Sequence, residues 1–241
     1  MIITEQKSGE DLFALLGSAR RVVLLGCSEC ATICKTGGTE QLLEFEKKLK
    51  TRGLEVSARC VLNPACNAQV VKKALKGIRE ELAGADAIVS FSCGDGTQTV
   101  AKLVGQMEHT FHIPVYPGND TLFLGETTRA GEYVEACRAC GRCELGWTGG
   151  ICPVTCCAKG LLNGPCGGAK GRQCEVNADE ECVWLRICDR LAAIGQLDNL
   201  LEIRPPRDYL KNVHPRRHVL ESRRSADRLK EARAKEGQDA K

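Results

Sequence analysis

The sequence predicts an α/β fold in which a doubly wound parallel sheet is followed by a small cysteine-rich domain organised by metal. Apolar runs alternate with helical periodicity over the first half of the chain, which indicates strand–helix–strand units. Ten of the 16 cysteines lie between Glu132 and Leu200, among many glycines and with little apolar periodicity. Such a segment cannot bury much apolar surface, so metal must organise it. We therefore expect an α/β domain in residues 1–130, a cysteine-rich iron–sulfur or zinc domain in 131–206 and a charged tail in 207–241.

Four segments are predicted to form the parallel strands. Residues 21–27 are a continuous apolar run, which is typical of a strand covered on both faces. Residues 55–62 and 87–93 are the second and third strands, and 114–116 is a short fourth.

Amphipathic patterns between these strands predict the helices. They fall over residues 39–50, 69–82 and 97–108, and a further helix is expected over 181–193 in the cysteine-rich region. Because crossovers between parallel strands are right-handed, this order of elements implies a doubly wound sheet.

Three cysteines stand at the carboxyl ends of predicted strands. Cys27, Cys60 and Cys93 are spaced equally along the chain, one strand–helix unit apart. Ligands of open parallel sheets bind at that edge. The fold is therefore expected to bring thiols from distant parts of the sequence together at one edge of the sheet.

The number of cysteines is the most informative feature of the composition. The chain has 16 cysteines, and disulfides, structural zinc or iron–sulfur clusters can each account for so many. The first residues lack a basic stretch followed by a long apolar one, so we expect no secretion signal and a cytoplasmic protein, which disfavours disulfides. None of the four histidines lies in a cysteine cluster, which favours ligation by cysteine alone.

Charge and hydropathy exclude two classes of partner. A net charge of +3 with 27% charged residues is ordinary for a soluble protein and does not indicate nucleic-acid binding. No apolar run approaches the ~18 residues of a membrane span. Aromatic residues make up only 4% of the chain, so its core must rest on aliphatic side chains.

The loop after the first predicted strand carries a C-x2-C-x3-C pattern formed by Cys27, Cys30 and Cys34. Three thiolates this close can wrap one metal centre, and a fourth ligand must come from elsewhere. We expect Cys93, at the tip of the third strand, to be that ligand. The reserves are Cys60 and Cys66. A [4Fe–4S] cluster is favoured over zinc, and a redox pair or plain buried thiols are the remaining alternative.

Eight cysteines of the cysteine-rich region are predicted ligands, enough for two four-cysteine sites. A C-x2-C-x2-C run followed by Cys-Pro resembles bacterial ferredoxins, except that eight residues rather than three precede the Cys-Pro. The eight are Cys137, Cys140, Cys143, Cys152, Cys156, Cys166, Cys174 and Cys182. Cys157 and Cys188 are set aside, the latter because it lies on the apolar stripe of the predicted helix over 181–193. At least one [4Fe–4S] cluster is expected here, and zinc ribbons are the structural alternative.

Two glycine-rich turns accompany the cysteines. Gly94-Asp95-Gly96-Thr97 could cradle an anion, but it is not a dinucleotide-binding fingerprint, and a tight strand-to-helix turn is favoured. Residues 163–168, Asn-Gly-Pro-Cys-Gly-Gly, are expected to form a turn that presents Cys166. Glycines there let backbone N–H groups approach cluster sulfurs.

The cysteine-rich region closely resembles one known family, the methylenetetrahydrofolate reductase C-terminal domain. That domain also occurs as the small iron–sulfur subunit of acetogen-type methylenetetrahydrofolate reductase. The stretches that carry the likeness are Cys137-x2-Cys140-Gly141-x-Cys143, Thr148-Gly149-Gly150-Ile151-Cys152-Pro153-x2-Thr155-Cys156, Asn163-Gly164-Pro165-Cys166-Gly167-Gly168 and Gly171-x2-Cys174-Glu175-Val176. In the N-terminal half, Gly26-Cys27-x2-Cys30-Ala31-Thr32-x-Cys34 is similar to the same subunit, so the resemblance covers about residues 22–206.

The resemblance implies a specific role. In the family, a separate catalytic subunit is a (βα)8 barrel that holds a flavin and the folate substrate, and such a barrel needs about 250 residues. This chain has no room for a barrel beside its cysteine-rich region. The resemblance therefore implies an electron-transfer subunit, non-catalytic alone, that receives electrons from a low-potential donor protein and passes them to the flavin in one-carbon metabolism. Its cofactors would be two or three [4Fe–4S] clusters, with zinc as the alternative at one site.

Three other functions stay open at this point. The chain could be a zinc or iron–sulfur module of another oxidoreductase or methyltransferase complex. It could be a purely structural zinc protein that scaffolds a partner. An enzyme that binds a nucleotide at residues 94–97 is disfavoured because no phosphate-binding fingerprint is present.

Overall fold

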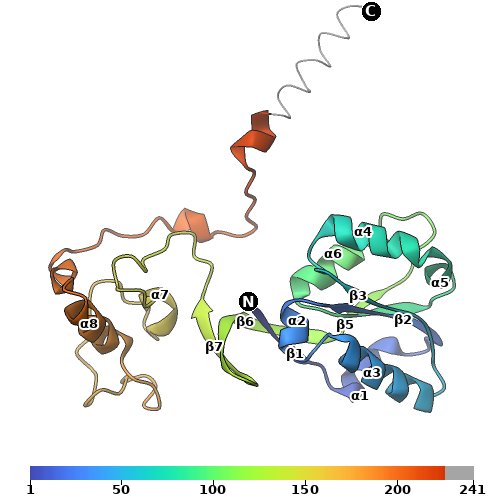
Figure 1. The fold of residues 1–241 in the computed structure, drawn as a ribbon, viewed down its shortest axis with the longest axis horizontal. Coiled ribbons are helices and arrows are strands. Elements are labelled where there is room, and N and C mark those ends of the chain that lie inside the picture. Colours follow the sequence, from blue (N-terminus) through green and yellow to red (C-terminus); the bar gives the residue numbers. More distant parts are fainter. Residues whose placement is uncertain (226–241) are drawn as a thin grey trace, which may run out of the picture.

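The computed structural model describes residues 1–225. An α/β lobe and a cysteine-rich lobe lie on opposite sides of a β-hairpin (Figure 1). The part of the expected charged tail beyond residue 225 lies outside the described residues. Within the described part, every helix is too short or too polar to cross a lipid bilayer.

The predicted parallel sheet is confirmed. Its four strands lie in the order β3-β2-β4-β5, so the first of them in the chain is central and the connections run outward in both directions. The strands are β2 (Arg21–Cys27), β3 (Glu55–Leu62), β4 (Ala87–Phe91) and β5 (Val115–Pro117). In the register, Leu25 is opposite Cys60 in β3 and Ser90 in β4.

Helices cover both faces of this sheet, because side chains of β2 alternate between two apolar clusters. Val22 and Leu24 pack beneath α1 (Gly9–Leu16) and α3 (Thr39–Thr51). Val23 and Leu25 pack on the opposite face, which is covered by α4 (Ala68–Gly77), α5 (Arg79–Ala83) and α6 (Gly94–Val104). This is the mixed α/β architecture that the alternation of elements predicted.

The expected helix over residues 69–82 was wrong in one respect, because the structure breaks it at Ile78 into α4 and α5. Gly77, a poor helix former, is the last residue of α4, and Leu75 and Leu82 on either side of the break face the same apolar cluster. The helix expected over 97–108 begins three residues earlier, at Gly94, and ends at Val104 before Gly105.

A second, antiparallel sheet was not predicted. It consists of β1 (Ile2–Gln6), β6 (Asn119–Arg129) and β7 (Glu132–Cys137), in the order β1-β6-β7. Ile2 is opposite Leu124, and Leu124 is opposite Cys137. This sheet therefore spans the domain boundary that was expected between residues 130 and 131.

Buried polar contacts join the two sheets. The hydroxyls of Thr4 in β1 and Thr36 in the loop after β2 are 2.6 Å apart, and both side chains are buried. Gly118 N donates to Ser90 O over 2.8 Å. The Thr4–Thr36 contact fixes the first strand of the chain against the loop that carries Cys30 and Cys34, and the Gly118–Ser90 bond ties the start of β6 to β4.

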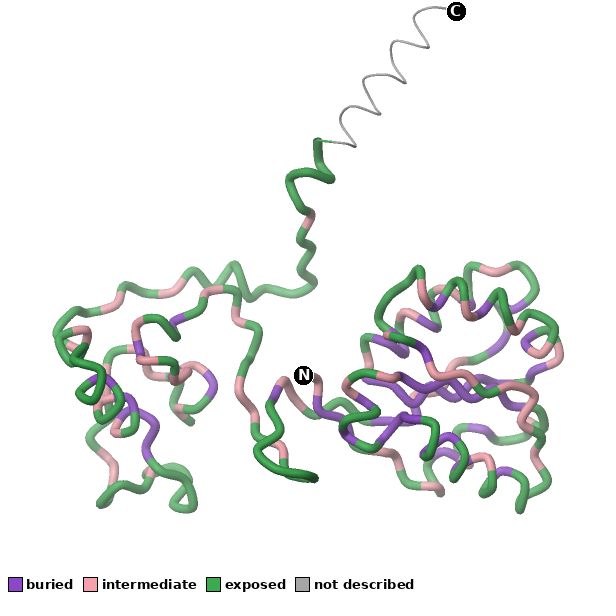
Figure 2. Tube along the Cα trace, viewed as in Figure 1, coloured by how far each residue is buried: buried purple, intermediate pink, exposed green. Residues whose placement is uncertain are grey.

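The cysteine-rich lobe has little regular structure and a small core. Its helices are α7 (Pro153–Cys156), α8 (Val183–Ala193) and the short 3-10 turns Leu197–Leu201 and Tyr209–Asn212. Its core centres on Trp184, Ile187 and Leu191 of α8. Figure 2 shows buried segments throughout the parallel sheet and few in this lobe.

Candidate metal centres

The first candidate site lies between the end of β7 and the start of α7. One pocket there is lined by four of the eight predicted ligands, Cys137, Cys140, Cys143 and Cys152. The turn that carries three of them is tight, because Ala139 and Gly141 both have positive φ, 50° and 81°. The structure therefore gathers the C-x2-C-x2-C run and the Cys-Pro cysteine at one place.

Backbone groups contact two sulfurs of this first site, one as donor and one as acceptor. Ala139 N donates to Cys137 Sγ over 3.3 Å. Cys140 Sγ donates to Arg142 O over 3.4 Å. N–H groups on ligand sulfurs are a common means of stabilising thiolates and tuning a bound metal centre.

The second candidate site lies beside the N-terminus of α8. A separate pocket there is lined by the other four predicted ligands, Cys156, Cys166, Cys174 and Cys182. Cys157 lines the same pocket and packs against the core of the lobe, so it is a fifth thiol at this site. The sequence prediction set Cys157 aside, and only its position beside Cys156 could have drawn attention to it.

Local turns present the cysteines of the second site. Gly164 and Gly167 have positive φ of 102° and 79°, as expected for a turn that exposes Cys166. Gly168 N donates to Cys166 Sγ over 3.4 Å. That N–H group and the Lys159 ammonium hold the pKa of the Cys166 thiol below its ordinary value. Lys159 is itself paired with Glu175.

The third predicted set lies between the edge of the parallel sheet and β1. Cys27 and Cys93 are buried at the ends of β2 and β4. Cys30 and Cys34 instead face β1: Ile2 N donates to Cys30 Sγ over 3.4 Å, and Cys34 Sγ lies 3.8 Å from Ile2 O.

The reserve cysteines fall in different places. Cys66 lies at the sheet edge, where its charge interacts with those of Cys93 and Cys27, so three thiols from three loops share this region. Burial and the nearby Asp95 carboxylate raise the pKa of the Cys66 thiol. Cys60 packs instead into the apolar cluster beneath α4 and α6, and burial raises its pKa.

The glycine motif at the start of α6 forms a tight turn, in line with the favoured interpretation. Gly94 N donates to Thr121 Oγ1 over 2.8 Å. A Cβ on Gly96 would lie 2.7 Å from Ser92 Oγ and 2.9 Å from Ala65 Cβ, so only glycine fits. The turn between β4 and α6 thus packs closely against β6 and the loop that carries Ala65.

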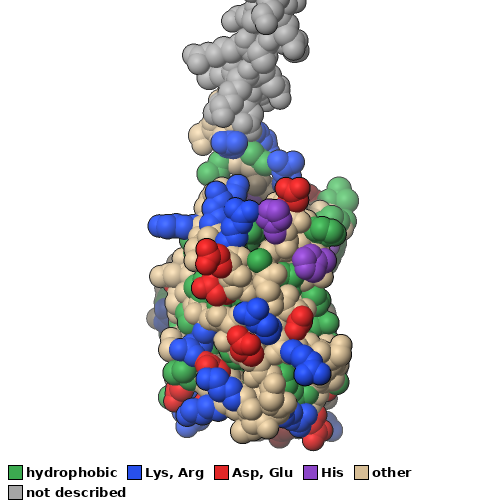
Figure 3. Space-filling view, turned by 90° about the vertical axis from the view of Figure 1, so that its right-hand side faces the viewer, with side chains coloured by type: hydrophobic (Ala, Val, Ile, Leu, Met, Phe, Trp, Pro, Cys, Tyr) green, Lys and Arg blue, Asp and Glu red, His purple; other side chains and the backbone are tan. Residues whose placement is uncertain are grey.

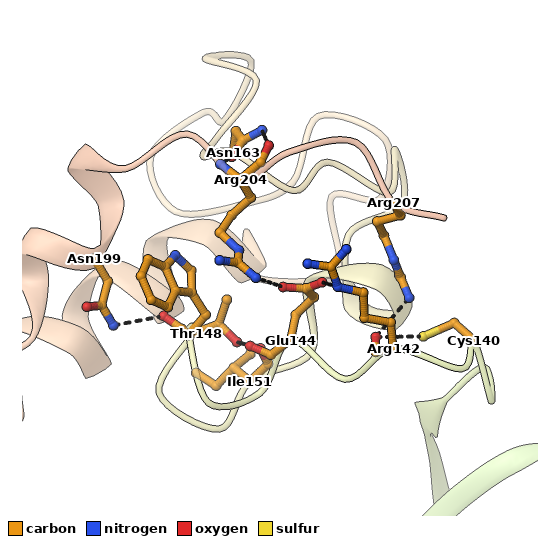
Figure 4. A network of polar contacts seen from close by, with 10 residues as sticks. Cys140, Arg142, Glu144, Thr148, Ile151, Asn163, Asn199, Arg204 and Arg207 are labelled. Carbon is orange, nitrogen blue, oxygen red and sulfur yellow. Dashed lines mark hydrogen bonds and ion pairs between the residues drawn. The ribbon is translucent and has the colours of Figure 1, made fainter. Parts of the chain in front are cut away.

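A polar network ties the C-terminal segment to the first site (Figure 4). We name residues 203–216 the C-terminal strap. Glu144, 8% exposed, lies between Arg142 and Arg204, with N–O distances of 3.7 and 3.3 Å. The Arg204 guanidinium also lies over the Trp147 ring, 4.6 Å from its centroid. The strap begins in the segment expected to close the cysteine-rich domain and continues into the expected tail.

Arg207 of the strap reaches a predicted ligand. Its Nη2 donates to Arg142 O over 2.8 Å, and the Cys140 sulfur lies 3.4 Å from the same oxygen, so the guanidinium charge acts on that sulfur. Burial alone would raise the pKa of the Cys140 thiol, but the Arg207 contact and the Arg142 backbone lower it below the ordinary value. The sequence offered no signal for Arg207, because it lies more than sixty residues beyond the cysteine it contacts.

Charges of both signs are mixed on the face shown in Figure 3, with Lys and Arg side chains next to Asp and Glu. Across residues 1–225, no three Cys, His, Asp or Glu side chains are gathered as tightly as a single metal ion requires. The four predicted ligands of each cysteine-rich site instead line one pocket per site.

Residues 116–210 match the family model described as methylene-tetrahydrofolate reductase C terminal. The match includes β6, β7 and all nine cysteines of the two pockets. Its name links this part of the chain to methylenetetrahydrofolate reductase, which is consistent with one-carbon metabolism. No curated protein and no solved structure matches the chain.

Proposed function

We propose that this protein is an iron–sulfur subunit that delivers electrons to the flavin of a methylenetetrahydrofolate reductase catalytic subunit. The observation that carries the proposal is the division of the eight predicted ligands between two pockets, four in each, with Cys157 as a fifth thiol in the second. Four cysteine thiolates are the ligand set of a [4Fe–4S] cluster. The family match over residues 116–210 supports the link to the reductase.

The donor chemistry of both pockets fits such clusters. When bound, each cluster would supply one-electron transfer at a potential set by its surroundings. The chain's own groups hold the thiolates: Ala139 N and Gly168 N each donate to the sulfur of the cysteine two residues earlier. Fixed N–H donors of this kind stabilise negative charge on sulfur without side-chain rearrangement.

A third centre at the sheet edge is part of the proposal. Its ligands would be drawn from Cys27, Cys30, Cys34 and Cys93, with Cys66 as a further candidate because it shares the edge with Cys27 and Cys93. Zinc is the alternative occupant at one of the three sites.

The proposed partners are a flavin-containing (βα)8-barrel subunit and a low-potential electron-donor protein. We place the complex in the cytoplasm, because 16 unpaired thiols are compatible with a reducing compartment. The hairpin β6–β7 contacts both lobes: Tyr133 Oη donates to Ile33 O over 3.2 Å, and β7 leads directly into the first site.

The first experiment measures iron, zinc and acid-labile sulfide, with a visible spectrum, on anaerobically purified protein. About eight or more iron atoms per chain with matching sulfide are expected for two or three cubane clusters. Zinc alone, with no sulfide and no absorption near roughly 400 nm, would exclude electron transfer and leave a structural scaffold.

Single substitutions test the division into sites. Cys140→Ser and Cys166→Ser should each remove about four iron atoms and four sulfides, because each breaks one four-thiol set. Cys60→Ser and Cys188→Ser are the matched controls and should leave iron unchanged. If Cys60→Ser lowers iron as much as Cys140→Ser does, the assignment of ligands is wrong. At the sheet edge, Cys93→Ser and Cys66→Ser compare the two candidate ligands directly.

Electron delivery requires the partner. The chemically reduced chain, mixed anaerobically with the flavin-containing reductase subunit, should bleach the flavin's visible absorption. A chain carrying both Cys140→Ser and Cys166→Ser should bleach it far more slowly. A fully loaded chain that neither binds the subunit nor reduces its flavin would overturn the proposed role.

A further inference from the structure

The C-terminal strap holds down the turn that carries the first cysteine site. Arg204 N donates to Asn163 Oδ1 over 2.7 Å, and Asn163 Nδ2 returns a bond to Arg204 O over 3.1 Å. With the Glu144 ion pair and the Trp147 contact described above, Arg204 anchors the start of the strap to the lobe. The segment that follows therefore cannot swing freely away from the cysteines.

The far end of the strap is anchored on the cysteine turn itself. Arg216 Nη1 donates to Ala139 O over 2.6 Å and to Lys211 O over 3.2 Å. Gly141 lies so close to Lys211 that a Cβ on the glycine would be 3.0 Å from Lys211 Cβ. The strap and the loop between Cys137 and Cys143 are in direct contact.

Between these anchors, Arg207 places a positive charge on a thiol of the first site. Arg207 Nη2 and Cys140 Sγ converge on the same acceptor, Arg142 O, as Figure 4 shows. Because the two groups share this acceptor, the guanidinium charge acts on the Cys140 sulfur. Arginine keeps its charge at any ordinary pH and makes strong bonds to anionic acceptors.

The second site has a weaker counterpart. The cation nearest to Cys166 is Lys159, and its ammonium is shared with the Glu175 carboxylate, which also lines that pocket. Arg186 acts on Cys156, but Glu135 and Glu126 act on the same thiol with opposite sign. At the first site the lining carboxylate, Glu144, is already paired with Arg142 and Arg204, and Arg207 adds a further positive charge. The net positive charge next to the thiolates is therefore smaller at the second site.

A cubane held by four thiolates carries negative charge and gains more on reduction, so a nearby cation favours the reduced form and raises the reduction potential. We propose that Arg207 is a positioning residue that raises the reduction potential of the first four-cysteine site above that of the second. Electrons would then collect at the first site. This inference rests on the proposed iron–sulfur function.

The test compares Arg207→Gln and Arg207→Lys with the matched control Arg217→Gln, which removes an exposed arginine just beyond the strap. Each full-length variant is purified anaerobically, its iron and sulfide are counted, and it is titrated with reductant while the reduced clusters are followed by electron paramagnetic resonance. The signal that Cys140→Ser abolishes identifies the first site.

We expect Arg207→Gln to keep its iron and to shift the reduction equilibrium of the first-site signal at least tenfold toward the oxidised form, which is about 59 mV for a one-electron couple. Arg207→Lys should restore most of the shift, and Arg217→Gln should match the parent chain. Full iron with an unchanged first-site potential in Arg207→Gln would overturn the inference alone. Loss of about four iron atoms that lysine does not restore would make Arg207 a structural residue and also overturn it. A parent chain with zinc and no iron would overturn both this inference and the proposed function.

Discussion

Glu144 is the buried carboxylate on which the first cysteine site and the C-terminal strap both depend. Its side chain is 7% exposed and faces Arg142 from the cysteine loop and Arg204 from the strap. A buried charge is tolerated only when such partners remain, and removing one member leaves the others uncompensated. At the scale of single residues, the cysteine-rich lobe is held by this kind of charge network as well as by its small apolar core.

Glu144→Gln is therefore expected to lower the free energy of unfolding of this lobe by about 1–3 kcal/mol. Urea titration of the metal-loaded protein, followed by tryptophan fluorescence, measures it, since Trp147 and Trp184 both lie in the lobe. The matched control is Glu132→Gln at the exposed hairpin, whose pair with Arg129 should contribute less than about 0.5 kcal/mol. Equal effects of the two substitutions would contradict the prediction.

Asp86 gives a pH-dependent prediction. Its carboxylate accepts from Arg20 N and Arg21 N over 2.7 and 2.8 Å, and the Arg21 and Arg20 backbone N–H groups hold its pKa below the usual value. A carboxyl group whose folded pKa is depressed stabilises the fold above its unfolded pKa, about 3.9, and this contribution is lost as pH falls through the folded pKa.

We expect Asp86→Asn to be slightly less stable than the parent at pH 7, by under about 1 kcal/mol because the group is exposed. The gap should close on acidification to about pH 3. Urea unfolding at both pH values measures it. A gap that stays constant with pH would show that the charge of Asp86 is not what stabilises the fold.

At the scale of elements, the parallel strands were predictable because each one is encoded in a local pattern. The apolar run at β2 and the spacing of the following helices need no knowledge of distant contacts. The antiparallel sheet could not be predicted from the sequence, because β6 and β7 are largely exposed and β1 pairs with a strand more than a hundred residues away. Solvent-facing strands give a weak alternation of apolar and polar residues, and their pairing is decided by the tertiary fold.

The loop that carries Cys30 and Cys34 returns to the sheet through close backbone contacts. A Cβ on Gly37 would lie 1.9 Å from Phe91 O, and one on Gly26 would lie 2.3 Å from Gly37 O. Neither neighbour is a flexible side chain, so no small movement relieves the overlap. The loop can therefore pack against β2 and β4 only because positions 26 and 37 are glycine.

Gly37→Ala should destabilise the α/β lobe by about 1–3 kcal/mol and lower metal content at the sheet edge. Gly77→Ala is the control, because a Cβ on Gly77 would have no neighbour within 4 Å and alanine favours helix at the end of α4. Thermal unfolding followed by circular dichroism separates the two. A Gly37→Ala protein as stable as the Gly77→Ala protein would refute the packing argument.

For the whole molecule, the two lobes differ in what holds them together. The α/β lobe has two extended apolar clusters, one on each face of its sheet, whereas the core of the cysteine-rich lobe is small. A segment with so little buried apolar surface depends on its metal for folding free energy. The lobes should therefore respond differently when metal is removed.

Chelation under anaerobic conditions should abolish hydrogen-exchange protection over α7 and α8 and leave protection in β2 and β4 close to that of the loaded protein. Peptide-level exchange with mass spectrometry measures both lobes in one sample, so the α/β lobe is the internal control. Loss of protection in both lobes together, or in neither, would contradict this division.

The sequence could identify the candidate metal-binding thiols but not how they are shared among sites. Eight ligands and a C-x2-C-x2-C run follow from spacing alone, yet the partition depends on where the turns at Gly141 and Gly167 direct the chain. Arg207 and the edge position of Cys66 are likewise set by tertiary contacts. Local sequence patterns identify the residues that can bind metal, and the fold decides which of them share a site.

The pairing of β1 with β6 also means that β1 must wait for its partner during biosynthesis. Strand β1 leaves the ribosome well before its partner, which is more than a hundred residues behind it, a delay on the order of ten seconds at ~5–20 residues per second. Strands β2, β3 and β4 emerge during this interval and can pair before β1 has a neighbour. Ile2 can therefore settle beside Cys30 and Cys34 in its final position only after β6 has been synthesised, and during that interval these two thiols are not covered by a paired β1.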